Sequence, residues 1–143
     1  DDRYEFTDIG VHVDRGNVVA RAEYVTRSSE TFSELVDADG WYVFGGYRFG
    51  NVLPYAIYAV TEPDAGVQPG QLSSEQSTIA AGVRWDAFSA ATVKLQVDRV
   101  DTDDTRGISF LTDTFTPPGT SLTVALPVED PVTVLSIAVD YVF

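Results

Sequence analysis

Charged side chains are the residues of this chain that could bind or orient a polar molecule, and they recur at alternate positions. Arg21 and Glu23 are two residues apart, and so are Arg84 and Asp86. Alternate residues of a β-strand point to the same face. The sequence therefore predicts strand faces that carry charges of both signs, which suits the wall of a water-filled pore. The pore-lining residues predicted in this way are Arg21, Glu23, Arg48, Arg84, Asp86, Lys94, Gln96, Asp98 and Asp140.

Two of the basic residues in this set face each other if residues 77–100 form a hairpin centred on Ser89. These are Arg84 and Lys94. Like charges directly opposite each other destabilise a sheet, so we expect carboxylates nearby to compensate. Two interpretations stay open, a basic patch that biases permeation toward anions or a lattice of ion pairs that stiffens the wall. The compensating residues expected on the same faces are Glu23, Asp86 and Asp98.

Catalysis and cofactor binding have little support in the residue types. The chain has no cysteine and a single histidine, His12, so a Ser-His triad or a histidine metal site would depend on that residue alone. We expect no enzymatic activity and no cofactor.

Acidic residues gather between the expected strands, most densely in the run Asp101-Thr102-Asp103-Asp104. Clustered carboxylates suit Ca²⁺ or Mg²⁺, and such ions could bridge to anionic lipopolysaccharide. However, the glycine and the bidentate glutamate of an EF-hand are not at their required spacing. A solvated acidic loop is the other interpretation. The metal candidates are Asp101, Asp103 and Asp104.

Composition restricts the classes of protein that remain. With 22 acidic and 9 basic residues the formal net charge is -13, which opposes binding to nucleic acid. Mean hydropathy is -0.02, and no segment approaches the roughly 20 apolar residues of a membrane helix. A β-barrel wall alternates apolar and polar residues and has the same near-zero average.

Period-two alternation recurs along the chain and predicts one all-β domain over residues 1–143. The connections are expected to alternate between short and long, and the strands are about ten residues long. Both features are typical of an antiparallel transmembrane β-barrel. The expected strands are 4–13, 18–27, 41–49, 53–61, 77–86, 91–100 and 132–143.

An odd number of strands cannot close a bacterial single-chain barrel. We therefore expect further strands upstream, or an additional element within 101–130, where residues 108–114 are the candidate. Strand 53–61 has no clearly polar face. Interfacial aromatic girdles are expected at the strand ends from Tyr24, Trp41, Tyr47, Phe49, Trp85, Phe88, Tyr141 and Phe143.

The last strand alternates apolar residues and ends on an aromatic one, namely Leu135, Ile137, Val139, Tyr141 and Phe143. This strand resembles the last strand of the general porins of Gram-negative bacteria. Other segments that resemble porin hairpins are 10–14, 22–24, 41–43, 45–50, 54–55, 82–86 and 95–100. The resemblance implies the C-terminal part, about seven strands, of a barrel of about 16 strands. It also implies an outer-membrane channel for passive diffusion of small hydrophilic solutes. Further implications are a homotrimer, contact with lipid and lipopolysaccharide, and recognition of the terminal strand by the barrel-assembly machinery.

Two alternatives remain from the residues themselves. One is a soluble β-sandwich that binds calcium or carbohydrate through its acidic loops. The other is a structural or adhesive barrel whose loops bind a partner.

Overall fold

The computed structural model is an antiparallel, all-β structure. It describes residues 4–29, 37–63, 75–102, 113–115, 124–126 and 131–141. The long strands are β1 (Tyr4–Arg15), β2 (Val18–Ser29), β3 (Ala38–Tyr47), β4 (Val52–Pro63), β5 (Gln76–Phe88), β6 (Ala91–Asp101) and β9 (Val132–Tyr141). Two short strands, β7 (Asp113–Phe115) and β8 (Val124–Leu126), complete the described elements.

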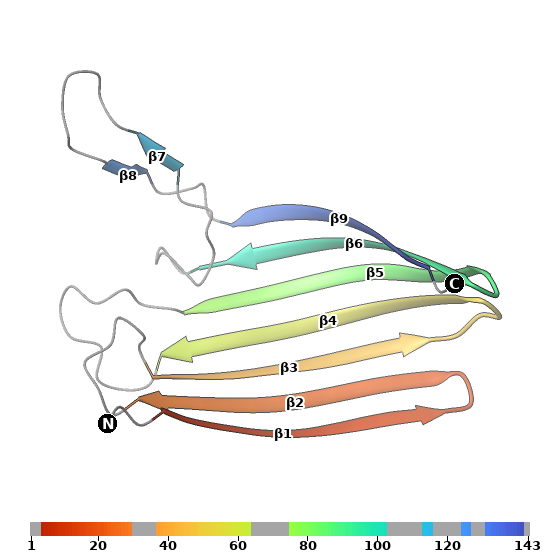
Figure 1. Cartoon of the computed structure of the whole chain (residues 1–143), viewed down its shortest axis with the longest axis horizontal. Helices are drawn as coiled ribbons and strands as arrows, with labels where there is room; N and C mark the ends of the chain where they lie inside the picture. Colours follow the sequence, from red (N-terminus) through yellow and green to blue (C-terminus); the bar gives the residue numbers. More distant parts are fainter. Residues whose placement is uncertain are drawn as a thin grey trace.

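The long strands form one seven-stranded sheet in the order β1-β2-β3-β4-β5-β6-β9 (Figure 1). Every neighbouring pair is antiparallel. Strands β7 and β8 pair only with each other and form a separate sheet. The seven-stranded sheet is not closed, because β1 and β9 are its two edges.

Three tight connections join β1 to β2, β3 to β4 and β5 to β6 at one end of the sheet, which we call the short-turn end (Figure 1). Gly16 and Gly50 adopt positive φ angles of 59° and 63° in the first two connections. Glycine takes this conformation without steric cost, which allows strands to reverse within a few residues. Strand β9 also ends at the short-turn end. The expected alternation of the connections is therefore confirmed.

One face of the sheet is apolar across all seven strands, and we call it the apolar face. Cross-strand partners point to the same side, so the register defines its members. Charged residues on this side lie only near strand ends among the described residues. The face comprises Ile9, Val11, Val13, Val18, Ala20, Ala22, Tyr24, Trp41, Val43, Gly45, Tyr47, Val52, Pro54, Ala56, Tyr58, Val60, Ile79, Ala81, Val83, Trp85, Val93, Leu95, Val97, Leu135, Ile137, Val139 and Tyr141.

This apolar face is open to its surroundings. Ile9 is 71% exposed and Ile137 is 70% exposed, and even the more central Val43 is 45% exposed. The opposite side, which we call the mixed face, packs more closely. The buried hydrophobic residues of the described chain all lie on it, and they are Val19, Ala38 and Ala80.

Aromatic side chains of the apolar face fall into two groups. Near the end opposite the short turns, Trp41 contacts Tyr58 edge-to-face, with ring centroids 5.4 Å apart. At the short-turn end, Tyr47 packs against Phe49 with centroids 4.9 Å apart. The second group also contains Trp85, Phe88 and Tyr141.

The strands differ from the expected ranges mainly at their ends. Strand β3 begins at Ala38, three residues earlier than expected, and Asp14 and Arg15 belong to β1 rather than to the turn. The candidate element at residues 108–114 lies mostly outside the described residues. Its last two residues belong to β7, which pairs with β8 and adds no strand to the main sheet. None of the described residues forms a helix long and apolar enough to cross a membrane.

Candidate functional site

All nine residues predicted from their spacing to line a pore share the mixed face. They come from β2, β5, β6, β9 and the turn after β3. Their side chains point to one side because each lies an even number of positions from the others on its strand. The register then carries this side from strand to strand across the sheet.

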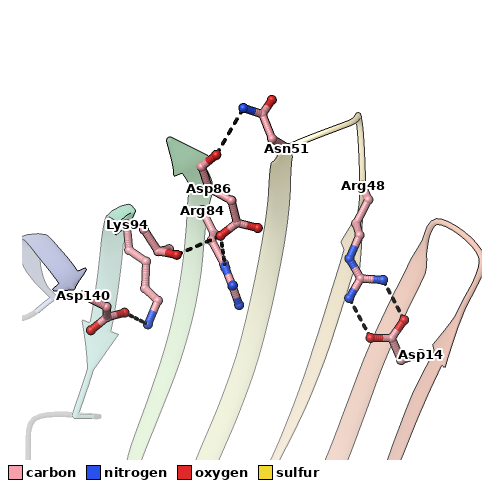
Figure 2. A network of polar contacts seen from close by, with 8 residues as sticks. Asp14, Arg48, Asn51, Arg84, Asp86, Lys94 and Asp140 are labelled. Carbon is pink, nitrogen blue, oxygen red and sulfur yellow. Dashed lines mark hydrogen bonds and ion pairs between the residues drawn. The ribbon is translucent and has the colours of Figure 1, made fainter. Parts of the chain in front are cut away.

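Three ion pairs lie on the mixed face near the short-turn end (Figure 2). Two oxygens of Asp14 accept hydrogen bonds from Arg48, each at 2.6 Å, in a bidentate contact. Arg84 Nε lies 2.9 Å from Asp86 Oδ1, which also accepts a hydrogen bond from Thr92. The third pair joins Lys94 Nζ and Asp140 Oδ2 at 2.7 Å.

The expected opposition of two cations is present, since Arg84 and Lys94 are direct cross-strand partners. Asp86 compensates Arg84, as expected. The partner of Lys94, however, is Asp140 on β9, which was predicted to line the same face but not to form this pair. Each cation thus has its own carboxylate, so this part of the face is locally neutral.

The pair formed by Arg48 and Asp14 is well defined by its surroundings. The backbone N–H of Arg48 donates a hydrogen bond to the Asn17 carbonyl oxygen at 2.7 Å. This bond fixes the backbone of Arg48, whose side chain extends over β2 to Asp14 on β1. In the register, buried Val19 lies between Asp14 on β1 and Gly46 on β3. The hydrogen-bonded carboxylate raises the pKa of the Arg48 guanidinium above its ordinary value.

Further from the short turns, polar groups are joined in smaller contacts. Gln96 Nε2 donates to Asp98 Oδ1 at 2.6 Å, so this carboxylate does not neutralise Lys94. Tyr42 donates to Glu23 at 3.2 Å. Arg21 lies over the ring of Phe44, 5.7 Å from its centroid, an arrangement typical of a cation–π contact.

Strand β4 contributes no charged side chain to the centre of the mixed face. The register places Tyr55 and Ile57 on this side, with Pro54, Ala56, Tyr58 and Val60 on the apolar face. This resolves the ambiguity of strand β4. Neither alternating pattern within β4 is polar, so only pairing with β3 and β5 could assign its two faces.

The described part of the chain contains no cluster of side chains that could bind a metal ion. No three histidine, cysteine, aspartate or glutamate residues gather there as metal ligands. Of the metal candidates, Asp101 ends β6, whereas Asp103 and Asp104 lie outside the described residues.

The alternating apolar residues of the last strand, which the resemblance to porins implies are recognised during assembly, lie on the apolar face where they are described. Leu135, Ile137, Val139 and Tyr141 alternate along edge strand β9 and are each 65–70% exposed. Phe143 lies outside the described residues.

Comparison with known protein families, curated proteins and solved structures gave no match for this chain.

Proposed function

We propose that the seven-stranded sheet is part of the wall of an outer-membrane β-barrel that conducts small hydrophilic solutes. The proposal depends above all on one observation, the continuous and exposed apolar face across all seven strands. Large exposed apolar patches mark surfaces that contact a membrane or a partner. A bilayer would contact every strand of such a face at once.

The properties of the mixed face support the proposal that this side of the wall faces water. It carries three ion pairs among the described residues. Its small apolar residues are also the most buried hydrophobic residues of the described chain. Side chains crowd on the concave side of a curved sheet and spread apart on its convex side. The observed difference in burial agrees with a lumen on the mixed face and lipid on the apolar face.

Because β1 and β9 are open edges, a membrane wall built from this sheet needs further strands to close it. Unpaired backbone groups are costly in lipid, so a membrane sheet must close on itself. Strands β1 and β9 run in the same direction in an antiparallel sheet of seven strands. Closure by antiparallel neighbours alone would therefore take an odd number of further strands.

The alternative hypothesis, a soluble β-sandwich, requires a second sheet that covers the apolar face. Within the described residues the other sheet is the hairpin β7–β8, with three residues in each strand and no contact with the large sheet. This is far less than the area that seven strands present. Assembly as a homotrimer, contact with lipopolysaccharide and recognition of β9 by the assembly machinery belong to the same proposal.

The test is to purify the full natural chain and add it to planar lipid bilayers. We expect extraction only with detergent and stepwise conductance increases after insertion, absent from a mock preparation in the same detergent. A monodisperse protein without detergent that leaves bilayers sealed would overturn the proposal. Efficient insertion without conductance would favour a structural or adhesive barrel.

A further inference from the structure

Tyr55 lies flat against the mixed face instead of standing away from it. Its direct partners on both neighbouring strands are glycines, Gly46 on β3 and Gly82 on β5. The Tyr55 hydroxyl donates a 2.8 Å hydrogen bond to Gln96 Oε1 on β6. The side chain therefore starts on β4, crosses β5 and ends at β6.

Gly82 makes this path possible. A Cβ atom at Gly82 would lie 2.5 Å from both Cζ and Oη of Tyr55, far inside van der Waals contact. With any other residue at this position, the tyrosine ring or the neighbouring backbone would have to move. The same Cβ would also approach the Leu95 carbonyl oxygen at 2.8 Å.

Tyr55 has a second contact, an aromatic one, with Phe44 on β3. Phe44 stacks on Tyr55 with ring centroids 5.3 Å apart and an interplanar angle of 29°. Arg21 in turn lies over Phe44. Aromatic and guanidinium groups thus form a layer along the wall from β2 to β6.

We propose that Gly82 is a positioning residue that keeps Tyr55 flat and so sets the free width of the lumen beside β4 and β5. This inference rests on the proposed channel function. A tyrosine that stands up from the wall occupies the space through which solute passes, whereas a flat one leaves that space to water. The size limit for solutes then depends on a residue that no solute contacts.

The experiment uses Gly82→Ala in the full natural chain in planar bilayers. We expect lower single-channel conductance and slower permeation of larger neutral solutes, measured by liposome swelling. Gly45→Ala is the matched control, because a Cβ there has nothing within 4 Å and lies on the apolar face. This control should conduct like the unchanged protein.

Removing the ring separates its effect from that of the Leu95 contact. Tyr55→Ala combined with Gly82→Ala should restore the conductance, since no ring remains to be lifted. Tyr55→Ala alone should change conductance little, because a flat ring blocks little of the lumen. A double variant that stays narrow, or a large rise in Tyr55→Ala alone, would overturn the inference. If Gly82→Ala does not assemble, a large rise in Tyr55→Ala would still overturn the inference.

A spectroscopic measurement tests the positioning without any conductance. In detergent micelles the Gly82 Hα resonances should be shifted upfield by the ring current of Tyr55, and Tyr55→Ala should abolish the shift. If the Gly82 Hα resonances of the natural chain show no upfield shift, Tyr55 does not lie flat over Gly82. Channels with unchanged conductance in Gly82→Ala contradict the inference alone, whereas a chain that never conducts contradicts the proposed function and the pore-width role with it.

Discussion

At the scale of single residues, the mixed face combines many charges with local neutrality. Arg84 and Lys94 would repel each other as direct neighbours, and Asp86 and Asp140 remove that repulsion. Such exposed pairs contribute about 0.2–1 kcal/mol each to folding. Their larger consequence is for the field in a lumen, because each carboxylate cancels one cation.

Asp140→Asn should make the proposed channel more permeable to anions. The substitution leaves Lys94 uncompensated beside Arg84, so the local charge becomes more positive. The loss of stability should stay within about 1 kcal/mol. Reversal potentials in a KCl gradient measure the change, and Asp140→Glu, which keeps the charge, should match the natural chain. An unchanged potential, or a shift toward cations, would contradict the charge assignment.

At the scale of elements, alternation alone predicted the seven strands and both faces of most of them. It succeeds because one face is apolar along the middle of each strand, as at Ile79, Ala81, Val83 and Trp85. Strand ends were less predictable. The segment from Ala38 to Gly40 pairs fully with β2 and β4 although its residues are small or polar.

Beyond the Arg84–Lys94 opposition within one hairpin, the contacts between strands could not be predicted from local pattern. The Asp14–Arg48 pair spans β2, and the Lys94–Asp140 pair depends on the register between β6 and β9, which are separated by a long connection. The flat course of Tyr55 depends on glycines that come from two other strands. Period two assigns a residue to a face, but it says nothing of which side chains meet there.

Charge on the apolar face of β9 should be costly in a bilayer, which tests the role of this face directly. Ile137→Arg should reduce the free energy of unfolding in liposomes by about 2–4 kcal/mol, the cost of arginine near the bilayer midplane. Its neighbour Ser136 lies on the mixed face, so Ser136→Arg should cost no more than about 0.5 kcal/mol. Denaturant titrations give both values.

Depth adds a control on the same face of the same strand. Thr133 lies near the start of β9, away from the short turns, so the depth-dependent cost of Thr133→Arg should be only about 0–1 kcal/mol. Repulsion from its direct partner Arg99 adds to this cost, but the total should stay below the loss at Ile137. Equal losses at Thr133 and Ile137 would indicate a protein core rather than a bilayer. No loss at Ile137 would indicate that the face meets water.

At the scale of the whole molecule, the distance between the two tryptophans can be compared with the thickness of the proposed membrane wall. Trp41 is level with Ser77 through Val60, and Trp85 lies eight residues further along β5. Eight residues span about 26 Å along a strand. If the strands had the usual barrel tilt of about 40°, this length would correspond to a height of about 20 Å along β5, against an apolar band of about 25 Å in outer-membrane barrels.

The two tryptophans of the chain therefore report on both margins of the apolar face. In liposomes that contain brominated lipids, both should be quenched more strongly by bromine near the headgroups than by bromine in the middle of the acyl chains. This follows because indole rings of membrane barrels lie at the interfaces. Trp41→Phe and Trp85→Phe leave one reporter each, so the margins are measured separately. Maximal quenching at mid-chain depth would place a margin inside the hydrocarbon, and fluorescence that no brominated lipid quenches would mean that the apolar face does not meet lipid at all.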